Sequence, residues 1–231
     1  MDRLLAIFSL SDYEALAFFL FVWAGYTLLT DASFLRPRSI AAAMERQRQR
    51  WFEEAFRRDL RILDTGILQI LMSGMNMFAS TSIIVIGGLF AAMGYNEALA
   101  GALARMPFAT PSSPEQLMVK LAVLLAIFIY AFFKFAWAIR LSHYCAILLG
   151  GFGFALAEPS EADQQRVAAA ARLNTLCGLH FNRGIRAIFF GLATVGWFIG
   201  PVFYVASTLF ILAILARREF GSAAAAAVKS L

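Results

Sequence analysis

Five polar side chains lie within ten residues of an otherwise apolar stretch, and their chemistry suits water, ions or a neighbouring helix. They are Ser73, Asn76, Ser80, Thr81 and Ser82. The surrounding run, 66–94, has no charged residue and exceeds the ~20 residues that a helix needs to cross the hydrocarbon core. One interpretation is a hydrophilic lining for ion or water passage in an oligomer. The other is a helix-packing seam with hydrogen bonds between helices, which we favour because hydroxyl groups bond readily across such contacts.

Small residues of the same run recur at a fixed spacing. They form the pairs Ser73-Gly74, Ser80-Thr81 and Gly87-Gly88. Successive pairs are seven residues apart, so they fall along one narrow strip of a helix with a period near 3.5 residues. Small side chains let helix backbones approach closely in lipid. The pattern therefore predicts that the other helices pack on this one along the strip.

Four basic side chains are candidates for a vestibule at the inner mouth of the membrane domain. They are Lys134, Arg140, Arg183 and Arg186. Cationic groups at this depth attract anions or bind the phosphates of lipids. The alternative is interfacial anchoring, because long basic side chains reach from an apolar helix to the headgroups.

Arg61 and Asp64 lie three residues apart at the start of the uncharged run, on one face of a helix. The spacing predicts an ion pair at the membrane entrance, either between these two residues or with Arg183 or Arg186. No Asp, Glu or His is expected at membrane depth. Since proton-coupled pumps usually carry such groups there, we do not expect one.

All cysteines and histidines fall in two pairs, His143-x-Cys145 and Cys177-x-x-His180. These residue types bind zinc, but residues two apart on a helix point to different sides. We therefore interpret them as two small buried thiols and two interfacial histidines, and expect no metal. Since we find no nucleophile motif, carboxylate dyad or nucleic-acid-binding module, we also expect no enzyme activity, no cofactor and no nucleic-acid partner.

The composition places these side chains in a membrane protein. The chain has 231 residues, of which 61% are hydrophobic and 15% charged, whereas soluble domains are nearer half apolar and a quarter charged. Long uncharged runs predict membrane spans at about 13–30, 66–94, 117–137 and 185–216. Glycines and Pro201 inside the last run predict a bend in it. We therefore expect an all-α membrane protein, a four-transmembrane-helix bundle that forms a single domain over 1–231.

Cytoplasmic helical segments are expected between the spans, at 34–64 and 141–184. The first is rich in arginine, with apolar residues at helical spacing, so we interpret it as an amphipathic helix that lies on the membrane or packs on other cytoplasmic segments. Its basic residues far outnumber those of the loop at 96–116, so the positive-inside rule puts 34–64 in the cytoplasm, below the cell inner membrane of a bacterium.

The side of the C-terminus is left open by these patterns. Four crossings put both ends outside, whereas the arginine pair at 217–218 favours the inside, and the apolar piece 141–157 is too short to be assigned as a further span. The alanine-rich tail, 222–231, is expected to be loose.

Several short stretches resemble a known family of membrane proteins. They are RILD at 61–64, FASTS at 78–82 with the glycine pair 87–88, FFKFAWAIR at 132–140, GIR at 184–186, GWFIGP at 196–201 and REF at 218–220. Together they spread over about 34–222 and resemble the family of domain of unknown function 599, found in bacteria and plants. The resemblance implies a four-span α-helical membrane protein and supplies no catalytic residues.

Two hypotheses for the function follow. The first is a homo-oligomeric channel or passive transport protein, with anions as a candidate solute, whose pore is lined by the second span together with Lys134 and Arg140. The second is a non-catalytic scaffold or accessory subunit, with a membrane-protein partner on the same seam. In both, the lipid bilayer and its anionic lipids surround a chain of formal net charge +5.

Overall fold

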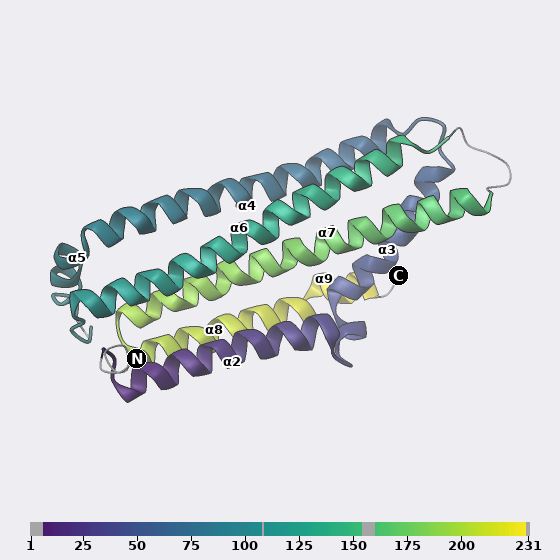
Figure 1. The fold of residues 1–231 in the computed structure, drawn as a ribbon. Coiled ribbons are helices and arrows are strands. Elements are labelled where there is room, and N and C mark those ends of the chain that lie inside the picture. Colours follow the sequence, from purple (N-terminus) through teal and green to yellow (C-terminus); the bar gives the residue numbers. More distant parts are fainter. Residues whose placement is uncertain (1–6, 108, 154–159, 230–231) are drawn as a thin grey trace.

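A computed structural model describes residues 7–107, 109–153 and 160–229, and over these residues the fold is entirely helical, with turns between the helices (Figure 1). The elements in chain order are α2 (Leu10–Ala32), η1 (Arg36–Arg38), α3 (Ile40–Phe56), α4 (Ile62–Gly94), α5 (Asn96–Leu103), α6 (Pro114–Gly150), α7 (Glu161–Thr194), η2 (Val195–Phe198), α8 (Pro201–Phe220) and α9 (Ala223–Lys229). The expected all-α fold class is confirmed.

Four helices are long and apolar enough to cross a membrane: α2, α4, α6, and α8 with the residues that follow it. Each presents large apolar side chains outward, among them Phe21, Ile84, Phe133 and Phe210. Outward apolar surface on long helices suits a lipid environment. The chain is therefore a multi-pass membrane protein, as its composition predicts.

The expected fourth span, 185–216, is not one bent helix. α7 ends at Thr194, the 3₁₀ turn η2 follows, and α8 begins at Pro201 and runs back along α7. A side chain at position 196 would place its Cβ 2.5 Å from Ser207 Oγ, so only glycine allows α8 to approach this turn. Pro201 has no N–H and is favoured as a first helical residue. Together these residues turn a predicted bend into a full reversal.

α7 runs along the bundle as a further long helix, although it is not among the four helices that are apolar enough to cross a membrane. It begins at the end of the bundle where α6 stops and runs back between α6 and α8 (Figure 1). The order across the bundle is α4, α6, α7, α8 and α2. As a result the described chain begins beside η2 and ends beside α3, at the other end of α8.

The segments expected between the spans change in detail. Residues 141–150 continue α6 and do not form a separate piece, while 154–159 lie outside the described residues. α3 is the expected amphipathic helix and buries Phe52 and Phe56 against the ends of α6 and α7. The tail expected to be loose forms α9, which packs on α3 and buries Ala225; positions 230–231 lie outside the described residues.

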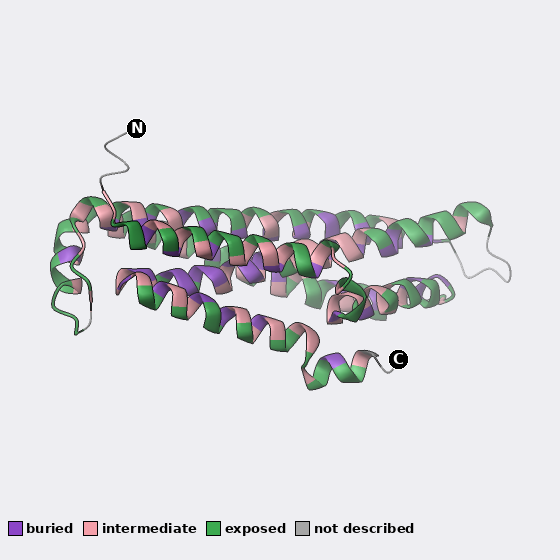
Figure 2. Ribbon diagram, turned by 90° about the horizontal axis from the view of Figure 1, so that it is seen from below, coloured by how far each residue is buried: buried purple, intermediate pink, exposed green. Residues whose placement is uncertain are grey.

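The core is aromatic and lies between α2, α7 and α8. Phe19 of α2 packs its ring 5.0 Å from that of Tyr204 and 5.8 Å from that of Phe190. Trp197 stacks on Tyr204 at 5.1 Å and donates its indole N–H to Asp12 at 2.8 Å. Buried residues line the faces that the helices turn toward one another, and exposed residues follow their outer faces (Figure 2).

Candidate functional site

The polar strip of α4 points away from the rest of the chain. Ser73, Asn76, Ser80 and Thr81 are exposed, and of the five predicted residues only Ser82 is buried. α4 stands at the edge of the bundle and packs along α6 through a different face (Figure 1). The prediction that the other helices of this chain pack on the strip is therefore wrong. Small residues on a helix therefore do not show by themselves that their face packs against other helices of the same chain.

The exposed strip is longer than predicted because it includes Gln69, which was not singled out in the sequence. Gln69, Ser73, Asn76 and Ser80 follow one another at intervals of four, three and four residues, which keeps them on one side of a helix. A Cβ added at Gly66 or Gly87 would meet no atom within 4 Å. The interval pattern, extended by one turn, would have found Gln69.

The hydroxyl groups of Ser73 and Thr81 in this strip form hydrogen bonds within the helix, whereas the amides of the strip do not. Ser73 Oγ donates to the Gln69 carbonyl and Thr81 Oγ1 to the Met77 carbonyl, each at 2.9 Å. Within the described residues no hydrogen bond holds the side-chain amide of Gln69 or Asn76. In a hydrocarbon environment an unsatisfied amide costs several kcal/mol, roughly 2–7. The two amides therefore need water or a partner helix.

The predicted ion pair between Arg61 and Asp64 does not form. Asp64 is fully buried and accepts from Arg58 Nη1 at 2.5 Å and from Trp51 Nε1 at 2.7 Å. Arg61 instead donates to four backbone carbonyls, including that of Phe152. The turn between α3 and α4 brings Arg58 to the carboxylate, which residue spacing within one helix does not reveal.

The four predicted vestibule residues separate into two groups. Arg183 Nε and Arg186 Nη2 each bind Asp31 of α2 at 2.7 Å, and Arg186 also donates to Thr30. On α6, Lys134 lies 5.0 Å from the ring of Tyr130, and Arg140 donates to Tyr144 Oη at 2.9 Å. Among the described residues the two groups share no hydrogen-bond or ion-pair partner, although the charge of Arg183 acts on Lys134. Arg186 instead joins a different cavity.

The predicted thiols are buried and do not form a metal cluster with the histidines. Cys145 donates toward the Ala170 carbonyl at 3.5 Å, and Cys177 lies 3.5 Å from the sulfur of Met75. His143 is exposed on α6, whereas His180 packs against Trp137. Across the described ranges no group of three or more His, Cys, Asp or Glu is placed to hold a metal ion.

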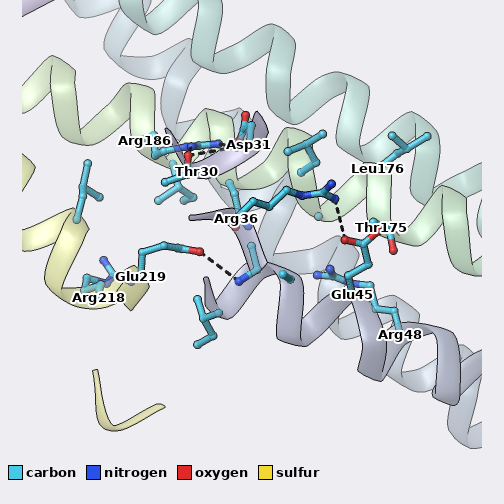
Figure 3. Close-up of a pocket in the computed structure, with 18 of the residues that line it drawn as sticks. Thr30, Asp31, Arg36, Glu45, Arg48, Thr175, Leu176, Arg186, Arg218 and Glu219 are labelled. Carbon is cyan, nitrogen blue, oxygen red and sulfur yellow. Dashed lines mark hydrogen bonds and ion pairs between the residues drawn. The ribbon is translucent and has the colours of Figure 1, made fainter. Parts of the chain in front are cut away.

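A pocket of about 730 Å³ opens among the C-terminal end of α2, α3, the middle of α7, the end of α8 and α9. Figure 3 shows its charged residues converging from these elements. Its charged lining residues are Asp31, Arg36, Glu45, Arg48, Arg172, Arg186, Arg218 and Glu219. Five arginines face three carboxylates, so the pocket carries an excess of positive charge. Of this set only Arg186 was predicted as a site residue, because the others come together only through the packing of α2, α3, α7 and α8.

The family model described as "Protein of unknown function, DUF599" matches residues 14–224. The match covers nearly the whole chain, including the α4 strip and every element of the pocket, so the chain belongs to this family. No curated protein matches it. No solved structure matches it either.

Proposed function

We propose that this DUF599 protein is a homo-oligomeric channel or passive transport protein of the cell inner membrane, in which the exposed strip of α4 lines or organises the path between subunits. One observation carries the proposal: the strip with Gln69 and Asn76 faces out of the single chain. Its amides lie on a helix of mean hydropathy 1.8. A second copy supplies either a water-filled gap or a partner helix for them.

The chemistry of the strip favours passive movement of solute. From 65 to 94 the helix carries no acidic, basic or histidine side chain. Proton-coupled transport uses such groups at membrane depth, and hydroxyl and amide groups do not change charge. Positive charge gathers at the end of the bundle with α3 and the pocket, which supports anions as the favoured solute and a cytoplasmic location for that end.

Flux from purified protein in liposomes tests the proposal. Asn76→Leu removes the amide and keeps a similar volume, while Met77→Leu changes an exposed apolar neighbour on the same helix and serves as the matched control. We expect chloride flux above that of protein-free liposomes, lowered at least tenfold by Asn76→Leu and unchanged by Met77→Leu. No flux from the wild-type protein, or equal flux from Asn76→Leu, contradicts the proposal.

A scaffold function is the second candidate. Ser73 and Thr81 bond carbonyls of their own helix, so parts of the strip present little unsatisfied polarity and suit close packing against another membrane protein. Purification in mild detergent separates the two functions. A stoichiometric foreign subunit that is lost in Asn76→Leu supports the scaffold, and a homo-oligomer without one supports the channel.

A further inference from the structure

The pocket is built at the level where two apolar helices end. Thr30 and Asp31 close the C-terminal end of α2, and Leu215, Arg218 and Glu219 belong to the last turns of α8. α3 packs on α7, and α9 packs on α3 (Figure 1). Helix ends that follow long apolar runs lie at the headgroup region of a bilayer. The cavity is therefore placed where lipid phosphates and soluble anions both have access.

Every carboxylate of the pocket is already engaged by this chain. Asp31 binds two arginines of α7, as described above, and Glu45 binds Arg36 Nη2 at 2.8 Å. Glu219 accepts from the backbone N–H of Ala41 at 3.2 Å, at the positive end of α3. Figure 3 shows the contacts of Asp31 with Arg186, of Glu45 with Arg36 and of Glu219 with the start of α3. The five arginines of the pocket therefore outnumber its three carboxylates, and two of these carboxylates already hold an arginine of this chain.

Arg48 is one of three arginines of the pocket that have no carboxylate partner among the described residues. Within the described residues it makes no ion pair or hydrogen bond. The charge of Glu45 acts on it, but Glu45 is bound to Arg36. Burial lowers the pKa of Arg48, because its guanidinium has lost part of its hydration and the nearby Cys177 and Glu45 offset this loss only in part. Arg172 and Arg218 line the same cavity without a carboxylate partner in the described chain; Arg218 rests on the ring of Phe189 at 5.4 Å.

A glycine makes room for the Arg48 guanidinium. A Cβ at Gly178 of α7 would lie 2.5 Å from Arg48 Nη2 and 2.8 Å from its Cζ. The planar group thus lies against the bare backbone of α7, beside Thr175 and Asn182 in the pocket lining. A guanidinium fixed in this way offers paired N–H donors, which match two oxygens of a phosphate group.

We propose that this pocket binds a phosphate-bearing anion, with Arg48 as its principal ligand and Arg172 and Arg218 as supporting charges. Arg186 is committed to Asp31 and Thr30 and shapes the wall. The same phosphate chemistry has two sources, the headgroup of an anionic lipid and inorganic phosphate in solution. The site is separate from the α4 strip and does not depend on conduction.

Two binding measurements on the full chain distinguish the sources. In nanodiscs of phosphatidylcholine with phosphatidylglycerol, native mass spectrometry counts the phosphatidylglycerol that stays bound. In detergent solution, equilibrium dialysis with labelled inorganic phosphate measures the soluble anion. Retained phosphatidylglycerol alone identifies a lipid site, and phosphate binding alone identifies a soluble-anion site. Absence of both overturns the proposal.

Matched variants tie the binding to Arg48. We expect Arg48→Gln to weaken binding at least about tenfold, equivalent to about 1.4 kcal/mol. Arg46→Gln, the same change at an exposed position of α3 outside this pocket, is expected to bind within about twofold of wild type. Equal losses in the two variants, or none in Arg48→Gln, overturn the assignment.

A second variant displaces the guanidinium and keeps its charge. Gly178→Ala pushes the flexible end of Arg48 aside, and we expect it to lose at least about fivefold in binding while remaining folded. Gly25→Ala is its control, because a Cβ there meets no atom within 4 Å. Binding by Gly178→Ala that equals that of Gly25→Ala contradicts the fork geometry assigned to Arg48.

Discussion

Replacing Asp31 with asparagine removes the only carboxylate that Arg183 and Arg186 contact in the described chain. Both guanidinium groups bind it at 2.7 Å, and the side chains of Asp31 and Arg186 are only 10% and 9% exposed. Breaking a buried ion pair by removing one partner costs about 3–5 kcal/mol. Because the Arg183 side chain is 29% exposed, we expect the free energy of unfolding to fall by an amount near the lower end of this range, about 3 kcal/mol.

Thermal unfolding of the purified protein in detergent measures this loss. For a chain of this length about 1 kcal/mol corresponds to about 2–4 °C, so Asp31→Asn should lower the Tm by about 6–12 °C. Asp59→Asn makes the same chemical change at an exposed position and should shift the Tm by less than about 2 °C. Adding Arg186→Met to Asp31→Asn should recover part of the loss. A Tm for Asp31→Asn within about 2 °C of wild type would refute the reasoning.

Two further predictions concern the ends of α7. Gly196→Ala places a methyl group 2.7 Å from a backbone carbonyl of α8, so it should destabilise the protein by about 1–3 kcal/mol, whereas Gly25→Ala should be neutral or slightly stabilising; thermal unfolding of both variants checks the difference in sign. Hydrogen bonds from its N-cap serine hold the pKa of Asp163 below its usual value of 3.8, so this group adds stability above that pH and loses it as the pH falls through the lowered pKa. Melting curves from about pH 6 to about pH 3 should therefore converge for wild type and Asp163→Asn, and a constant gap would contradict the assignment.

The apolar runs predicted much of the fold because length and composition are local properties. α2, α4 and α6 each contain the predicted span and extend beyond it. The amphipathic pattern of 34–64 likewise predicted α3, whose Phe52 and Phe56 are buried. The reversal at Gly196 was missed for the opposite reason. An uncharged run has the same hydropathy whether its helix continues, bends or turns back, and the close approach of α8 decides which.

The direction of the α4 strip could not be predicted from the spacing of small residues. Spacing places Ser73 and Ser80 on one side of the helix, but a neighbour decides whether that side is covered. In this chain α6 covers the side with Met75 and Ala79 instead. The exposure of this side excludes packing by the helices described in this chain, and the amides on it are the reason that we propose coverage by another subunit.

α7, which hydropathy did not identify as a membrane span, also explains why the pocket has an excess of positive charge. α7 has 34 residues but is not among the helices apolar enough to span a membrane by composition. A hydropathy average counts Arg183 and Arg186 as unfavourable in a membrane. It does not include the charge of their partner Asp31, because Asp31 lies 152 residues away from Arg183 in the sequence. Once α2 packs beside α7, that carboxylate neutralises much of the charge on the buried side of the cavity. Because Asp31 is bound by Arg183 and Arg186, Arg48 lines the same cavity without an ion-paired carboxylate in the described chain, and we propose that an anion binds there.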